Sequence, residues 1–470
     1  MKRWPWLVIP TWTALLSLAS SGLTPSGASS QGRSAAPDRA TFRTRSTSPI
    51  GAAYVDVDGL LANSFTRPDG SAGTYEAPVR LLYPVAQRSC TGVGLEDLAN
   101  GFFFNFGVHD DFWNLHYARR VLTDDFLMSR AVTYASPTWD KKAVDAMGRG
   151  HLERREDGLR VVHDVAAWLR DPSSVTVMGG DGPSCAAGTL VGYGVSDSAS
   201  LLRQLFAEGS APFDAGLVHA AGATCWDFGA GQATTECPRL PAGLAAKVLA
   251  IDSETDVDVQ SSASARQDGL ANYRHWEVAG AAHLTKAEGD LMEFARHAED
   301  ENPLLAVSFR ELGRAQNPES LGPVLRAAFD ALVRWATLGT APPANAYLDG
   351  AFDPTGSFTI ARDADGNALG GVRLPWLNTV LPDRSTVGAA IGRHSGTDAT
   401  GGFLLGGRYE CFADVTARYP TARFYADRVS AGASYAESQR WILTEDAARF
   451  ERYAANSDLG HLACPPWPDG

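Results

Sequence analysis

The sequence predicts an α/β fold built on a mostly parallel sheet flanked by helices. Two observations carry this prediction. Short, continuous apolar runs recur along the chain, as in strands that are buried on both faces. Helical stretches separate these runs, and strands that alternate with helices favour a parallel sheet. The 470 residues are 44% hydrophobic and 10% aromatic, which is enough apolar material for a sizeable core.

The predicted elements follow one another from residue 77 to residue 338. The strands are Ala77–Tyr83, Gly92–Leu98, Ala131–Ala135, Ser174–Gly179, Gly188–Tyr193, Ala215–Ala220, Lys247–Ile251 and Tyr273–Val278. The helices are Leu159–Arg170, Ala199–Phe206 and Val324–Leu338. Gly339 and the Pro342-Pro343 pair give the last helix a clear stop signal.

The chain divides into four predicted segments. Residues 1–30 have the order of a secretory signal peptide, with Lys2 and Arg3 before an apolar run and small residues behind it. An uncleaved membrane anchor is the alternative, although two prolines in the run weaken a spanning helix. Residues 31–50 lack an apolar period and are predicted to be a flexible lead-in. Residues 51–343 form the predicted core, and residues 344–470 form a C-terminal elaboration packed on it.

The charge and the cysteines bear on partners and compartment. With 41 basic and 54 acidic residues the net charge is -13, and this field repels nucleic-acid phosphates and anionic membrane surfaces. We therefore expect no nucleic-acid partner. No segment after the predicted signal is apolar enough to span a membrane, so we expect no stable membrane span once the signal is removed. Six cysteines suit a secreted or periplasmic protein, because disulfides persist there. They are Cys90, Cys185, Cys225, Cys237, Cys411 and Cys464.

Six cysteines allow 15 pairings, and the sequence alone does not choose among them. The local prediction joins Cys225 to Cys237, and a Cys411–Cys464 bond would tie down the tail. Buried free thiols are the alternative. No cysteine spacing is typical of zinc, and His109-Asp110-Asp111 lacks a second spaced pair of ligands. We therefore expect neither a metal nor an organic cofactor.

A nucleophile motif lies at the centre of the chain. An apolar strand runs into Gly194-Val195-Ser196-Asp197-Ser198 and then directly into an amphipathic helix. A nucleophile elbow has this layout: its serine sits on a strained strand-to-helix turn, so the residues two before and two after it must be small. Gly194 and Ser198 meet that demand. Ser196 is therefore the candidate nucleophile.

A carboxylate and a histidine follow in the order expected of this motif, serine then acid then histidine. An apolar run ends in Asp252-Ser253-Glu254-Thr255-Asp256, where the partner that orients the histidine belongs. Asp256 fits this register best, Glu254 is the alternative, and Asp252 is interpreted as a turn residue. The next apolar run ends in a small-residue loop that carries His283. From there His283 can remove the serine proton and return it to the leaving group.

Two backbone N–H groups are predicted to form an oxyanion hole. One belongs to Asp197, directly after the nucleophile. The second belongs to the loop Asn100-Gly101-Phe102, where Gly101 permits close approach of the backbone. The aromatic run that follows lines either a substrate pocket or the core.

These stretches resemble a family of bacterial exported α/β-hydrolase domain proteins with a long C-terminal extension. The resemblance covers most of the chain from about Tyr54 and rests on residues 194–198, 253–256, 276–283, 336–343 and 370–375. It implies an α/β-hydrolase fold and esterase-like chemistry, with a triad of Ser196, Asp256 or Glu254, and His283. The chain departs from the family at the elbow, where Asp197-Ser198-Ala199 stands in place of the usual Gln-Ser-Gly.

The leading functional hypothesis is a serine hydrolase that cleaves small-molecule or lipid-like carboxylic esters through an acyl-enzyme intermediate. Acyl transfer to an acceptor other than water is a second hypothesis, because the same triad serves both reactions. A non-catalytic binding protein on this scaffold is the third. It is motivated by the acidic side chain of Asp197 beside the predicted oxyanion hole.

Overall fold

The computed structural model describes residues 40–50, 53–85, 90–100, 117–180, 182–283, 296, 321–394 and 409–457. The predicted signal segment of residues 1–30 lies outside the described residues. The same is true of Gly101, the aromatic run after it, and Cys464.

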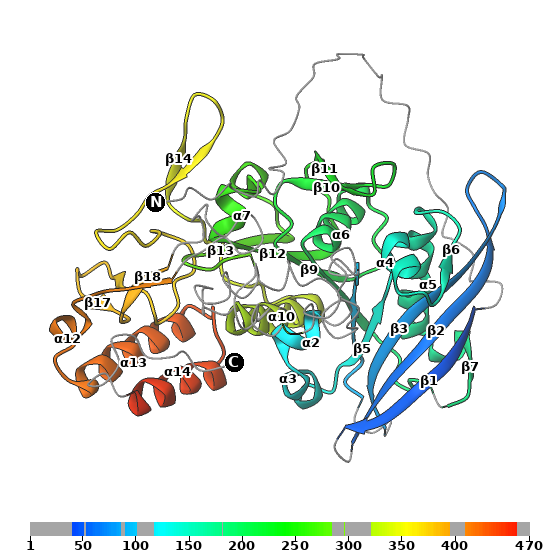
Figure 1. Cartoon of the computed structure of the whole chain (residues 1–470), viewed down its shortest axis with the longest axis horizontal. Helices are drawn as coiled ribbons and strands as arrows, with labels where there is room; N and C mark the ends of the chain where they lie inside the picture. Colours follow the sequence, from blue (N-terminus) through cyan, green and yellow to red (C-terminus); the bar gives the residue numbers. More distant parts are fainter. Residues whose placement is uncertain are drawn as a thin grey trace, which may run out of the picture. The chain divides into compact units, whose positions relative to one another are not determined.

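Parallel strands form one half of the 11-stranded sheet that the described residues build (Figure 1). In spatial order they are β13 (Tyr273–Val278), β12 (Lys247–Ser253), β9 (Ala215–His219), β8 (Thr189–Val195), β4 (Val93–Asp97) and β5 (Thr133–Pro137). Each neighbouring pair is parallel. Their carboxyl ends therefore meet at one edge, the position where ligands bind in α/β sheets.

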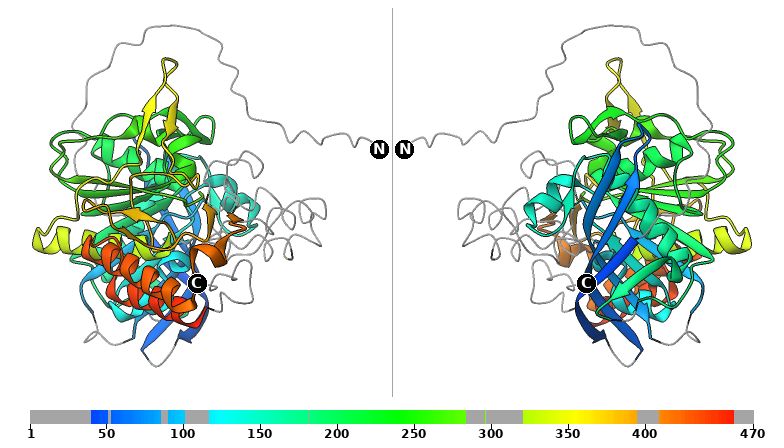
Figure 2. Two further views of the ribbon diagram at one scale, coloured as in Figure 1. Left: turned by 90° about the vertical axis from the view of Figure 1, so that its left-hand side faces the viewer. Right: turned by 90° about the vertical axis from the view of Figure 1, so that its right-hand side faces the viewer.

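The other half of the sheet is a long antiparallel meander. It consists of β3 (Ala72–Pro84), β2 (Tyr54–Thr66) and β1 (Ala40–Ile50), with β3 antiparallel to β5. The strand β7 (Val175–Met178) lies parallel to β1 at the outer edge, and β6 (His151–Leu152) pairs with β3. Figure 2 shows the meander facing the viewer in its right-hand view.

The predicted flexible lead-in of residues 31–50 is wrong from Ala40 onward, because these residues form β1. Few of them are apolar, so no period marks the segment as a strand. Phe42 is nevertheless buried, with its ring 4.9 Å from that of Trp168. Gly59 of β2 leaves room for the ring, since a Cβ there would lie 2.3 Å from Phe42 Cζ. One buried aromatic ring and the pairing with β2 thus fix this strand.

Helices cover both faces of the sheet, so the predicted α/β architecture is confirmed. The three predicted helices correspond to α5 (Asp157–Arg170), α6 (Asp197–Glu208) and α10 (Gly322–Leu338). Alternate strand residues point to opposite faces. Val191, Leu217 and Leu249 accordingly lie in one hydrophobic core, while Leu190, Val218 and Val248 lie in the other.

The two cores have different helices. Residues of α5, α6 and the short α4 (Lys141–Ala146) contribute to the second core. The first core contains residues of α10, α2 (Tyr117–Leu122) and α3 (Asp124–Ser129), together with two C-terminal helices. These are α13 (Ala422–Ser438) and α14 (Thr444–Asn456), which face the viewer in the left-hand view of Figure 2.

The C-terminal region covers the outer edge of β13. The Glu277 N–H donates to the Ala346 carbonyl at 2.8 Å, and the Val372 N–H donates to the Glu277 carbonyl at 2.8 Å. A covered edge strand presents no free row of backbone groups. The short elements here are β14 (Gly350–Phe352), β15 (Phe358–Ile360), β16 (Thr379–Val380), β17 (Thr386–Val387), β18 (Gly392–His394), β19 (Tyr409–Cys411) and α12 (Val415–Arg418).

Among the residues that the structure describes, one disulfide was predicted from the sequence and a second was not. The predicted Cys225–Cys237 bond is confirmed, and it lies in the hairpin of β10 (Thr224–Asp227) and β11 (Gln232–Glu236). A second bond joins Cys90 to Cys185. Cys411 is disulfide-bonded as well. Such bonds fit an oxidising compartment. Among the described residues, no helix is long and apolar enough to cross a membrane.

Loss of the Cys90–Cys185 bond is expected to cost more stability than loss of the Cys225–Cys237 bond. The two bonds span 95 and 12 residues of sequence. The loop-entropy model then gives about 4.7 kcal/mol for the longer loop and about 2.8 kcal/mol for the shorter one. Urea unfolding of the two double Cys→Ser variants measures both losses. The opposite order would contradict the loop-entropy account.

Glu96 of β4 is a buried acid whose carboxyl oxygens have no hydrogen-bond partner among the described residues. Burial raises its pKa well above the usual value, so the folded protein holds the carboxyl protonated. A carboxyl whose folded pKa is raised stabilises the protein fully only below its unfolded pKa. That contribution is then lost as the pH rises toward the folded pKa, by about 1.4 kcal/mol for each pH unit.

Glu96→Gln is therefore expected to make stability less dependent on pH. The neutral amide keeps the shape of the side chain and removes the proton that must dissociate. Urea unfolding at pH 6 and pH 9 should show a smaller loss of stability in the variant than in the wild type. Glu76→Gln is the control, because the Glu76 side chain is 41% exposed. If Glu96→Gln and wild type lost equal stability between the two pH values, the buried acid would not be the cause.

Candidate active site

Ser196 lies on a strained turn between β8 and α6. Its φ of 55° and ψ of -121° are far from both strand and helix values. The Ser196 N–H donates to the His219 carbonyl of β9 at 3.0 Å, so the neighbouring strand holds the turn in place. The Ser196 side chain remains partly exposed to solvent. Strain of this kind concentrates where a side chain must be presented for function.

The small residues around Ser196 are required by the geometry of the turn. A Cβ on Gly194 would lie 2.5 Å from the Ser198 carbonyl oxygen, which leaves room only for glycine. Ser198 is buried, and its Oγ accepts a hydrogen bond from Trp139 Nε1 at 3.1 Å. The requirement for small residues that the sequence predicted is thus met on both sides of the turn.

Ser196, His283 and Asp256 lie in one hydrogen-bonded row. His283 Nε2 is 3.2 Å from Ser196 Oγ, and His283 Nδ1 is 2.6 Å from Asp256 Oδ1. His283 is 1% exposed and Asp256 is fully buried. The structure therefore brings together the three residues that the sequence singled out first.

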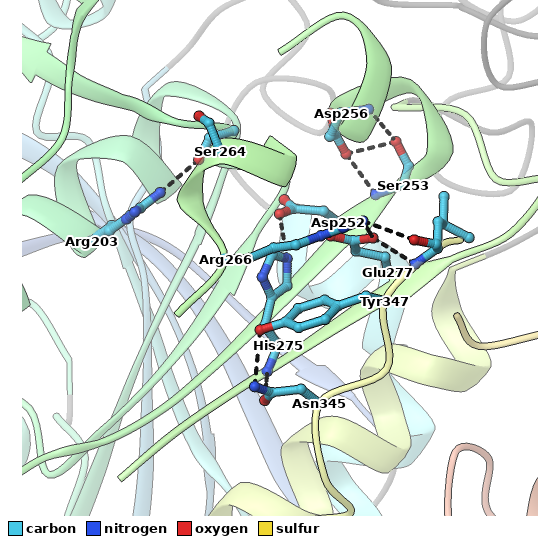
Figure 3. Close-up of polar contacts among 12 residues, drawn as sticks. Arg203, Asp252, Ser253, Asp256, Ser264, Arg266, His275, Glu277, Asn345 and Tyr347 are labelled. Atoms are coloured by element: carbon cyan, nitrogen blue, oxygen red, sulfur yellow. Dashed lines mark hydrogen bonds and ion pairs between the residues drawn. The ribbon is translucent and has the colours of Figure 1, made fainter. Parts of the chain in front are cut away.

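Asp256 is held by the first turn of α7 (Glu254–Asp258). Ser253 caps this helix: its N–H and its Oγ–H donate to Asp256 Oδ2 at 2.7 and 2.6 Å, and its Oγ accepts from the Asp256 N–H (Figure 3). Burial alone would raise the pKa of Asp256. The adjacent His283 and the Ser253 hydrogen bonds outweigh burial and lower the pKa, so Asp256 is ionised at neutral pH.

Glu254, the alternative acid, has different partners. Its Oε2 accepts from the Gly280 N–H at 2.8 Å, and its Oε1 accepts from Arg362 Nη2 at 2.8 Å. Glu254 is fully buried. The structure thus places Glu254 against the backbone of the loop that carries His283, and Asp256 against the His283 ring.

Asp252 was interpreted as a turn residue, and this interpretation is wrong. Asp252 belongs to β12, since that strand continues through Ser253. Its side chain is buried, and its Oδ2 lies 2.7 Å from Nε2 of His275 on β13 (Figure 3). His275 is buried in the core, and Asp252 supplies the hydrogen bond that a buried imidazole needs.

Of the two residues predicted to supply the oxyanion hole, the structure describes Asp197 but not Gly101. Asp197 is the first residue of α6, where helix N–H groups have no partner within the helix. Burial raises the pKa of the Asp197 carboxyl, while interactions with His283 and Lys142 and a hydrogen bond from the Ala233 backbone oppose that rise. Gly101 lies outside the described residues. The chain before it runs beside the elbow, because the Leu98 N–H donates to the Tyr193 carbonyl at 2.9 Å.

Two further residues at this site were not singled out as site residues from the sequence. His219 is fully buried at the end of β9, its Nδ1 lies 2.9 Å from Tyr193 Oη, and burial lowers its pKa to about 3. The Gln260 amide lies 3.3 Å from His283 Nδ1. Gln260 lies just past the end of α7, and its N–H donates to the Asp256 carbonyl at 3.2 Å; the four-residue spacing from Asp256 could have indicated it. No sequence signal distinguishes His219.

A parallel sheet with a serine at the strand-to-helix turn, followed by an acid and a histidine, defines the α/β-hydrolase class. The chain belongs to the alpha/beta hydrolase domain family, whose model matches residues 134–452, more than half of the chain. Membership in this family supports hydrolase activity. In the part of the chain that the structure describes, no group of three or more His, Cys, Asp or Glu side chains gathers as metal ligands would.

Solved structures resemble the chain only distantly. S-formylglutathione hydrolase from Staphylococcus aureus is 10% identical, over 49% of this chain and 90% of that one, with a TM-score of 0.27. A glucuronoyl esterase from Solibacter usitatus is 11% identical, over 47% of this chain and 70% of that one, with a TM-score of 0.30. A comparison with curated proteins gave no significant match.

Proposed function

We propose that the protein is a serine hydrolase that cleaves carboxylic esters through an acyl-enzyme intermediate. Ser196 is the nucleophile, His283 the general base, and Asp256 the residue that orients the histidine. The row of hydrogen bonds from Asp256 through His283 to Ser196 carries this proposal. Because Asp256 accepts from Nδ1, the imidazole presents an unprotonated Nε2 to the serine hydroxyl.

The reaction follows from this row in two halves. His283 Nε2 takes the proton of Ser196 as Oγ bonds to the ester carbonyl carbon. The bond from that carbon to the alcohol oxygen then breaks, and His283 returns the proton to the departing alcohol. In the second half, His283 removes a proton from water as the water oxygen bonds to the acyl carbon. The bond from that carbon to Ser196 Oγ then breaks, His283 returns the proton to Oγ, and the acid and free Ser196 are released.

The tetrahedral oxyanion would be stabilised by the backbone N–H groups of Asp197 and Gly101. The Asp197 carboxylate interacts electrostatically with His283 and Lys142 and accepts a hydrogen bond from the Ala233 backbone. These interactions support catalysis over the binding-protein alternative, since they reduce the repulsion that a free carboxylate would exert on the oxyanion.

We further propose that the substrate is a small-molecule or lipid-like ester and that the chain is exported, with residues 1–30 as its signal peptide. The cysteines support export to the periplasm or the exterior, because disulfides persist in oxidising compartments. The net charge of -13 disfavours nucleic acid as a partner.

Fluorophosphonate labelling tests the proposal. An activated serine displaces fluoride and forms a stable bond to phosphorus, so the modified peptide can be mapped by mass spectrometry. We expect labelling at Ser196 in the wild type and none in His283→Ala. Absence of labelling in the folded wild type, or labelling at another residue, would contradict the assignment and favour the binding protein.

A further inference from the structure

The loop that carries His283 is held by Glu254 at two points. The Glu254 carboxylate accepts from the Gly280 N–H at 2.8 Å, and the Glu254 N–H donates to the Ala281 carbonyl at 3.0 Å. Gly280 has a φ of 77°, a left-handed conformation that costs glycine little and keeps the chain turning toward His283. The position of the imidazole therefore depends on these contacts.

The C-terminal region contacts the same loop in two ways. Arg362 Nη2 donates to Glu254 Oε1 at 2.8 Å. The Ala279 N–H donates to the Val372 carbonyl at 3.0 Å. Residues separated from His283 by more than seventy positions of sequence thus contact the loop through a side chain and through the backbone.

A second buried carboxylate anchors this C-terminal segment to the core. Glu277 of β13 accepts from Arg266 Nε and Nη2 at 2.7 and 2.6 Å (Figure 3). It also accepts from the Leu348 N–H at 2.7 Å. Arg266 Nη2 also donates to the Leu348 carbonyl at 3.0 Å. With the Ala346 and Val372 bonds to β13, these contacts attach both ends of the segment that carries Arg362 to the core.

We propose that Arg362 is a positioning residue: acting through Glu254, it fixes the Gly280 peptide and so holds His283 against Ser196. The inference rests on the proposed function. The proposal gives the C-terminal region a part in catalysis through the loop that carries His283.

The physical reason is the charge on a buried carboxylate. Glu254 is fully buried, while the Arg362 side chain is 27% exposed. The guanidinium thus stays partly solvated and still neutralises the buried carboxylate of Glu254. A hydrogen bond from a backbone N–H to an ionised carboxylate is stronger than one to a neutral group. Without the guanidinium, the buried carboxylate takes up a proton or moves, and its bond to Gly280 weakens. A displacement of about 1 Å at a catalytic group can cost about 100-fold in rate.

The test compares Arg362→Met with Arg326→Met. Arg326 pairs with Asp446 at 2.5 Å and joins α10 to α14, so its loss also loosens the C-terminal region but does not touch the His283 loop. We expect Arg362→Met to lower kcat for a short aryl ester about 10- to 100-fold with KM nearly unchanged. Arg362→Lys should recover part of this loss, and Arg326→Met should lower stability while keeping kcat.

Two further measurements separate positioning from general destabilisation. Arg362→Met combined with Glu254→Gln should be no slower than Glu254→Gln alone, because both residues act along one chain of contacts. Hydrogen exchange of the Gly280 amide, read by mass spectrometry, should quicken in Arg362→Met and not in Arg326→Met. Unchanged kcat and unchanged exchange in Arg362→Met would overturn the inference.

Failure of the proposed function gives a different result. In that case the wild type itself neither hydrolyses esters nor reacts with the fluorophosphonate. The exchange measurement needs no turnover, so it still decides whether Arg362 holds the Gly280 peptide.

Discussion

Ser196→Ala is expected to lower kcat for a short aryl ester by about 10⁴- to 10⁶-fold, because the reaction loses the atom that bonds to the acyl carbon. The fold should be unaffected, since alanine removes only Oγ from a partly exposed side chain. The backbone strain at residue 196, where φ is 55°, is present in both the wild type and Ser196→Ala. Steady-state kinetics measures the loss, and thermal unfolding shows that the protein is intact.

Ser200→Ala is the matched control for this prediction. Ser200 lies one turn further along α6, and its Oγ contacts the Ala221 carbonyl at 3.3 Å and Thr224 Oγ1 at 3.2 Å. The same chemical change at this position should keep kcat within a fewfold of the wild type. Turnover that survives in Ser196→Ala would show that another residue is the nucleophile.

The sequence predicted the part of the fold whose residues are buried on both faces. All eight predicted strands exist: seven lie within two residues of their expected ends, and β3 begins five residues earlier than expected. Short, continuous apolar runs between helices admit few other structures. The strands β1 and β2 were not predicted. β1 has few apolar residues, and β2 carries Asp56 and Asp58, whose charges are paired with Arg80, Arg119 and Arg149 from distant parts of the chain. Partners of that kind cannot be read from local periodicity.

The candidate site was predictable where local geometry demands particular residues. Gly194 and Ser198 mark the elbow because a larger side chain does not fit, and Asp256 lies three residues after the Ser253 cap. The choice between Asp256 and Glu254 needed the fold. Both are buried acids on one short helix, and only the path of the loop after β13 decides which of them meets the histidine ring.

Asp256→Asn is expected to lower kcat by about 10⁴-fold, and the reason lies in the partners of both carboxylate oxygens. Ser253 donates two hydrogen bonds to Oδ2, from its N–H and its Oγ–H. These donors require an acceptor, so the oxygen of an asparagine would occupy that position and its NH₂ group would face His283 Nδ1. The imidazole must then accept at Nδ1 and carry its proton on Nε2, where it can no longer take the proton of Ser196.

Glu254→Gln is the comparison that makes this prediction decisive. Glutamine keeps one acceptor oxygen near Gly280 and Arg362, so the expected loss is about 10- to 100-fold, without the wrong tautomer at His283. Both variants should be assayed with one aryl ester, and their thermal unfolding should be recorded in parallel. If Glu254→Gln were the slower of the two, Glu254 would be the acid that orients the histidine. The 2.6 Å contact between Asp256 and His283 would then have only a structural role. Arg362 would in that case position the catalytic acid, Glu254, directly.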